Sequence, residues 1–86
     1  MSPAPLTEQD LSLRIRQVIA RTLEVPLEQV LPETRQGDFE KWDSLGHLNV
    51  VMELEAAFGV SFSTDEAIAM RSVQEAVAML AQRLSR

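Results

Sequence analysis

Residues 43–59 read DSLGHLNVVMELEAAFG and predict the helix around which the rest of the fold is arranged. Asp43 and Ser44 are residue types that begin helices, because their side-chain oxygens accept hydrogen bonds from free backbone N–H groups. Gly59 stands where a helix commonly ends in a left-handed conformation. We therefore expect a helix that begins near Asp43 or Ser44 and ends at Phe58.

This helix carries apolar side chains on two nearly opposite faces. At about 100° per residue, one face holds Val50, Val51, Leu54 and Phe58, and the other holds Leu45, Leu48 and Met52. A small bundle buries only one face of such a helix, and the i, i+3 and i+7 spacing of the second face is typical of a surface that a partner recognises. Either the preceding segment folds over the Leu45–Leu48–Met52 stripe, or the stripe is an exposed contact surface.

Upstream of this helix, the sequence predicts one further helix and a long loop. Thr7 is a suitable N-cap and apolar residues recur at helical spacing, so a first helix should run from about Glu8 to Thr22. Prolines and a glycine interrupt the pattern in residues 23–42, although a short helical turn is expected at residues 27–30. A loop of this length is uncommon in a small domain unless it is functional.

Downstream, two serine–glutamate pairs mark the starts of two more helices. Ser63 with Glu66 predicts a capping box for a short third helix, and Ser72 with Glu75 predicts the same device for the last helix. The expected fold is therefore all-α. It is a small four-helix bundle of three main helices and one short helix, with a long loop between the first and second helices.

The composition limits the kinds of protein that the chain can be. Its 86 residues suffice for one small domain, here residues 7–86, behind a flexible tail at residues 1–6 that two prolines mark. The chain has no cysteine, which excludes a disulfide framework and thiolate ligands. It contains neither a long apolar run nor a secretory leader pattern, so no membrane span is expected and we predict a cytoplasmic protein.

Negative charge is concentrated in the middle of the chain. The net charge is −5, and residues 38–66 carry seven of the thirteen acidic side chains against a single lysine. Nucleic acid is not an expected partner, because its phosphates require Lys and Arg. The acidic middle favours a protein partner with a basic patch, although an acidic surface that only keeps the protein soluble would have the same composition.

Ser44 has three interpretations: a helix cap, a nucleophile or a point of attachment. A nucleophile would need a base, for which His47 is the only histidine, together with an oxyanion hole and a cavity that excludes water. A lone helical histidine is more often structural, no GxSxG elbow is present and no metal-ligand spacing occurs, so we expect neither an enzyme nor a metal site. For attachment, a hydroxyl in the first turn of a helix is exposed, and the positive end of the helix dipole accommodates a phosphate group.

Residues 42–80, WDSLGHLNVVMELEAAFGVSFSTDEAIAMRSVQEAVAML, resemble the acyl carrier proteins. The DSL motif at residues 43–45 is similar to that family's attachment site for 4′-phosphopantetheine. The resemblance implies that a phosphopantetheinyl transferase moves this arm from coenzyme A onto Ser44, and that the terminal thiol of the arm holds an acyl group as a thioester. It also implies a non-catalytic carrier that presents its cargo to acyl-loading and acyl-transfer or condensing enzymes.

The resemblance further assigns roles to residues around Ser44. Asp43 would help to place the serine for modification, and Leu45 would contact the arm. The side chains that would meet partner enzymes and their basic patches are Leu45, Leu48, Met52, Glu53, Glu55, Asp38 and Glu40. A monomer is expected, and in this family a long acyl chain can enter the space between the helices.

The chain departs from the pattern of fatty-acid carriers. Gly46 and Asn49 stand where those carriers often have acids, and WDSLGHLN looks more like freestanding carriers of secondary metabolism or another dedicated pathway. Because glycine lowers helix propensity, we predict that Gly46 permits close approach of the arm or of a partner backbone; a tolerated first-turn glycine is the alternative. The glycine pair that usually precedes the serine of peptidyl carriers is absent, yet aminoacyl cargo stays open, as does an unmodified acidic interaction module.

Overall fold

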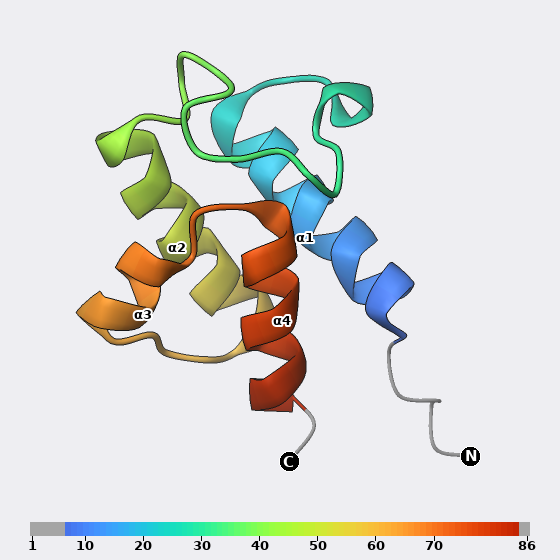
Figure 1. Ribbon diagram of the computed structural model, residues 1–86, viewed down its shortest axis with the longest axis vertical. Coiled ribbons are helices and arrows are strands. Elements are labelled where there is room, and N and C mark those ends of the chain that lie inside the picture. The colour runs from blue at the N-terminus through green and yellow to red at the C-terminus, as the bar shows by residue number, and fades with distance from the viewer. Residues whose placement is uncertain (1–6, 85–86) are drawn as a thin grey trace.

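A computed structural model describes residues 7–84, which form four α-helices and one 3-10 turn (Figure 1). In chain order the elements are α1 (Glu8–Leu23), η1 (Leu27–Gln29), α2 (Ser44–Phe58), α3 (Thr64–Ala69) and α4 (Val73–Leu84). Within the described residues, strand-like pairing is limited to one isolated bridge between Arg35 and Ser72. The predicted all-α four-helix bundle is therefore confirmed, whereas the predicted tail at residues 1–6 lies outside the described residues.

The helix ends follow from local hydrogen bonding. Thr7 Oγ1 accepts a hydrogen bond from the backbone N–H of Asp10 at 3.0 Å, and Ser63 Oγ accepts one from Glu66 at 3.1 Å, so both predicted starts have a side-chain cap. Gly59 ends α2 with φ +67°, a left-handed conformation that glycine adopts without steric cost. These local signals explain why the predicted bounds of the helices agree closely with the observed ones.

The hydrophobic core lies between α1, α2 and α4, because α1 packs against both other helices. Its centre is formed by Ile15 of α1, Leu54 of α2 and Leu80 of α4, which are fully buried. The face of α2 that holds Val50, Val51 and Leu54 points into this core. One of the two apolar faces of α2 is thus buried in the core.

The loop between α1 and α2 is anchored at both its middle and its end. Val30 and Trp42 are buried in the core, although they belong to no helix. The backbone N–H of Gln36 donates to the Arg71 carbonyl at 2.7 Å, and the N–H of Val73 donates to the Thr34 carbonyl at 3.0 Å. The loop therefore lies against the α3–α4 turn, at the end of the bundle where α2 begins (Figure 1).

Candidate functional site

Ser44 is the first residue of α2 and is exposed. Asp43 Oδ1 accepts a hydrogen bond from the Gly46 backbone N–H at 2.8 Å, so the aspartate caps the helix and the serine does not. Within residues 7–84, the Ser44 hydroxyl makes no hydrogen bond to another residue. The hydroxyl is consequently free at the positive end of the α2 dipole, where a phosphate group is stabilised.

The Leu45–Leu48–Met52 stripe is open to solvent. Its residues are 68%, 55% and 55% exposed, respectively, so the preceding loop does not fold over them. The exposure expected in the second interpretation of this stripe is therefore correct, whereas its role as a contact surface stays a prediction. Ile68 of α3 is also exposed, and it lines a cavity together with Leu48, which adds an apolar residue that the sequence analysis did not include.

Both ring nitrogens of His47 are engaged in the interior of the protein. The indole N–H of Trp42 donates to His47 Nδ1 at 3.0 Å, and His47 Nε2 lies 2.8 Å from the carbonyl oxygen of Ala67 in α3. Because an indole N–H can only donate, Nδ1 accepts and the ring carries its proton on Nε2, which donates to Ala67. His47 is buried in this network and has no free nitrogen to act as a base for Ser44.

Trp42 and His47 occupy the positions of a hydrophobic staple. Trp42 immediately precedes the Asp43 cap and His47 is the fourth helical residue, the spacing at which two side chains pack across a helix start. Their rings are stacked, with centroids 6.2 Å apart. The staple explains why a large aromatic residue stands at the end of the loop, and the spacing of residues 42 and 47 is the sequence signal for it.

Gly46 is required by the chain itself. A Cβ atom at this position would lie 2.0 Å from the backbone carbonyl oxygen of Lys41, far inside any permitted contact. Gly46 is buried, so neither the arm nor a partner backbone makes the approach that was predicted for it. The prediction of a close approach was right, but its assignment to an external group was wrong, because the end of the loop occupies that space.

A cavity of about 370 Å³ lies beside Ser44. It is lined by residues of α2, α3 and the two turns that meet there: Gln36, Ser44, His47, Leu48, Val51, Thr64, Ala67, Ile68 and Arg71. Arg71 is the one formally charged side chain of this lining, and no carboxylate takes part. The helical walls of the cavity thus combine four apolar with three uncharged polar side chains, and Arg71 adds a positive charge in a chain whose net charge is −5.

Several of the acidic residues predicted to meet partners make contacts within the chain. Glu55 Oε2 accepts a hydrogen bond from the Phe62 backbone N–H at 2.8 Å, and Asp38 Oδ2 accepts one from the Arg35 backbone N–H at 2.8 Å. These two carboxylates stabilise the turn after α2 and the loop before it. Glu53 lies 4.0 Å from the guanidinium of Arg21 on the surface, where such pairs contribute little.

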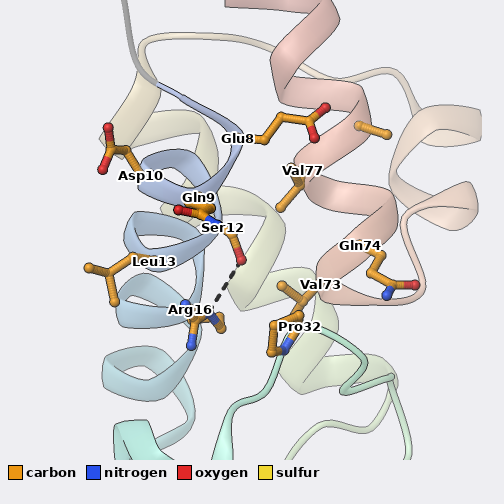
Figure 2. A pocket seen from close by; sticks show the side chains of 11 residues that line it. Glu8, Gln9, Asp10, Ser12, Leu13, Arg16, Pro32, Val73, Gln74 and Val77 are labelled. Atoms are coloured by element: carbon orange, nitrogen blue, oxygen red, sulfur yellow. Dashed lines mark hydrogen bonds between the residues drawn. The ribbon is translucent and has the colours of Figure 1, made fainter.

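A larger depression, of about 740 Å³, lies between α1, α4 and Pro32 (Figure 2). It shares no lining residue with the cavity beside Ser44. Its guanidinium, from Arg16, is turned toward its own helix, where Nε donates to Ser12 Oγ at 3.3 Å. The smaller cavity includes the exposed Ser44 in its lining and is therefore the better candidate for a functional role.

Comparisons with known proteins agree with this geometry. Residues 13–80 match the model of the family described as "Phosphopantetheine attachment site". The chain belongs to this family. It is also 32% identical to an acyl carrier protein of Rubrobacter xylanophilus over 84% of this chain and 89% of that protein. Acyl carrier proteins of Thermosynechococcus vestitus and Petrotoga mobilis are 29% and 28% identical, over 81% and 93% of this chain and 86% and 94% of their own lengths.

Membership of the family identifies the prosthetic group as covalently attached 4′-phosphopantetheine. The exposed serine and the adjacent cavity fit such an arm. Ser44 offers a free hydroxyl for attachment, and the cavity offers both apolar and polar side chains next to it. Proteins of this family act as carriers and work with a phosphopantetheinyl transferase and with enzymes that handle acyl groups. Among the described residues, no helix is long and apolar enough to cross a membrane.

Proposed function

We propose that Ser44 is the attachment point of 4′-phosphopantetheine and that the chain carries acyl groups on this arm. The observation that supports the proposal is the free, exposed Ser44 hydroxyl at the start of α2, next to an apolar stripe and a cavity. In the holo-protein, the thiol of the arm supplies the nucleophile that binds acyl groups as thioesters. Every catalytic step then belongs to partner enzymes, and the carrier itself is not an enzyme.

The residues of the chain explain how Ser44 would be modified. A bond forms between Ser44 Oγ and the phosphorus that bears pantetheine, and the bond from this phosphorus to adenosine 3′,5′-bisphosphate breaks. Since His47 has no free nitrogen, the base that removes the hydroxyl proton must come from the transferase. Asp43 caps α2 and so leaves the serine hydroxyl unoccupied, while the helix dipole stabilises the phosphodiester.

Intact mass measurement tests this attachment. The purified protein is incubated with coenzyme A, magnesium and a broad-range phosphopantetheinyl transferase, and Ser44→Ala and Ser61→Ala are treated in parallel. We expect a gain of one phosphopantetheine on the parent and on Ser61→Ala, whose serine is exposed but outside α2, and no gain on Ser44→Ala. A folded parent that several transferases leave unmodified would contradict the proposal and support the unmodified interaction module.

We further propose that partner enzymes bind the Leu45–Leu48–Met52 stripe and the acidic side chains near it. The exposed apolar side chains would supply buried contact area, and Glu40 and Glu53 would steer basic patches toward it. A basic partner fits the charge of residues 38–66. The expected monomer and the cytoplasmic location remain predictions, and both acyl and aminoacyl cargo are compatible with this surface.

A pair of leucine variants tests this partner surface. Leu48→Ala removes an exposed side chain of the stripe, and Leu13→Ala removes an exposed leucine from α1. We expect Leu48→Ala to raise the KM of the transferase for the carrier while thermal stability is unchanged, and Leu13→Ala to alter neither quantity. Equal KM values for both variants would exclude the stripe as the docking surface.

A further inference from the structure

One wall of the cavity beside Ser44 is held in place by hydrogen bonds. His47 lines the cavity, and its two hydrogen bonds connect the loop residue Trp42 with the α3 residue Ala67. Trp42 is 1% exposed, so its indole ring is buried in the core, where it holds the His47 ring by a hydrogen bond. A group that displaced His47 on its way from the cavity into the core would break both hydrogen bonds and leave the indole N–H and the Ala67 carbonyl without partners, which is unfavourable in a buried site.

The size of the cavity limits what it can hold. Its volume of about 370 Å³ is near the lower end of the range for ligand pockets, roughly 300–1,000 Å³. At about 30 Å³ for each water-sized group, this volume corresponds to about a dozen non-hydrogen atoms. Part of the space is required by the arm, since Ser44 stands in the lining. The remaining room suits a short acyl group of a few carbon atoms.

Arg71 places a positive charge in the lining of the cavity, whereas the net charge of the protein is negative. The Arg71 guanidinium belongs to none of the ion pairs found among residues 7–84 and makes no side-chain hydrogen bond there. Gln36 and Thr64 add uncharged polar groups to the same lining. Arg71 lines a cavity that has no carboxylate in its lining. A guanidinium without an ion-pair partner is suited to bind a carboxylate, which it can hold through two parallel hydrogen bonds.

We propose that the cavity beside Ser44 receives a short acyl group that ends in a carboxylate. Arg71 binds this carboxylate, and the Trp42–His47 pair keeps longer apolar chains out of the core. This proposal rests on the attachment of the arm to Ser44 and names the class of cargo for that site. It makes Arg71 a residue that determines specificity and His47 a positioning residue that limits chain length.

Matched cargoes test both parts of this proposal. The transferase loads the protein from amide analogues of succinyl-, butyryl- and octanoyl-coenzyme A, in which nitrogen replaces the thioester sulfur and prevents hydrolysis. Intact mass verifies loading, and the midpoint of thermal unfolding, Tm, is measured by circular dichroism. Succinyl and butyryl groups have the same number of carbon atoms, so their comparison isolates the carboxylate.

For the parent protein, we expect the succinyl form to have a Tm higher than the butyryl form by on the order of 5 °C. The octanoyl form should gain nothing over the butyryl form. In Arg71→Gln the advantage of the succinyl group should disappear although loading is unchanged. Arg35→Gln is the control, because Arg35 also lacks an ion-pair partner among the described residues but does not line the cavity.

The length limit has its own variant. Trp42→Phe removes the indole N–H but retains an aromatic ring, so His47 loses one of its two hydrogen bonds while the core keeps most of its volume. We expect the octanoyl group to raise the Tm of Trp42→Phe more than that of the parent. Equal Tm values for the succinyl and butyryl forms of the parent, or an octanoyl form that is the most stable, would overturn the proposal. Absence of loading would instead refute the attachment to Ser44.

Discussion

Replacement of Gly46 by alanine is expected to destabilise the protein, although alanine is the better helix former. Helix propensity alone would favour the variant by up to about 1 kcal/mol, and by less in a first turn. The added Cβ, however, would lie 2.0 Å from the Lys41 carbonyl oxygen and 3.3 Å from Asp43 Oδ1. The first distance can only be relieved if the backbone moves by more than about 1 Å, since such contacts normally exceed 3 Å.

The backbone that must move leads directly into Trp42. This residue is 1% exposed and hydrogen-bonded to His47, so a shift at Lys41 disturbs the core and the start of α2 together. Overpacking of this kind costs roughly 1–3 kcal/mol. After the gain in propensity is subtracted, we expect a net loss of about 1–2 kcal/mol, which corresponds to a Tm lower by roughly 4–16 °C for a domain of this size.

Thermal unfolding followed by circular dichroism measures this loss, and the fluorescence of Trp42, the single tryptophan, reports on the local environment. Two variants serve as controls. Gly59→Ala has free space for the new Cβ but retains φ +67°, so it should lose about 1–2 kcal/mol without altering the fluorescence of the folded state. Asn49→Ala, on the exposed side of α2, should gain a few tenths of a kcal/mol. A Gly46→Ala protein that is more stable than the parent would refute the steric explanation.

Two further predictions concern helix caps and pH. Asp43→Ala should lower the free energy of unfolding by about 1 kcal/mol, whereas Ser44→Ala should change it by less than about 0.5 kcal/mol, because only the aspartate caps α2. Urea unfolding of both variants measures the difference. Equal losses would contradict the assignment of the cap to Asp43. The hydrogen bond from the Ser63 backbone N–H, followed by the contact with Arg83, holds the pKa of Glu66 below its ordinary value. The ionised carboxylate therefore stabilises the fold above the unfolded-state pKa of about 4.3, and this contribution is lost as pH falls through the lowered pKa. Glu66→Gln should flatten that acid limb of the stability curve, and an unchanged limb would contradict the role of this carboxylate.

The sequence allowed the helices to be predicted well because their ends depend on neighbouring residues. The caps of α1 and α3 involve side chains three residues from the groups that they bind, and Gly59 ends α2 by its own conformational freedom. Such signals need no knowledge of the rest of the chain. The exposed stripe of α2 was predicted only as one of two interpretations, since its exposure depends on the course of a loop that sequence periodicity does not describe.

The functions of Gly46, His47 and Arg71 could not be predicted in the same way. Gly46 was linked to an external group, because the approach of the Lys41 carbonyl depends on how the loop turns into α2. His47 was recognised only as an unpromising base, because its partner Ala67 is twenty residues away in another helix. Arg71 was not considered, because it reaches the cavity through backbone pairing between the loop and the α3–α4 turn.

The amino-acid sequence by itself thus determined the class of the fold, the bounds of its helices and the serine that stands at the start of α2, since all of these depend on contacts within one helical turn or on a short motif. The tertiary structure alone decided which apolar face of α2 remains exposed. It also decided that His47 is buried and hydrogen-bonded in the interior, and that Arg71 lines the cavity beside Ser44. Those features arise where the loop, α2 and α3 meet, and the packing of segments distant in sequence is decided by the burial of the whole core and not by any local pattern.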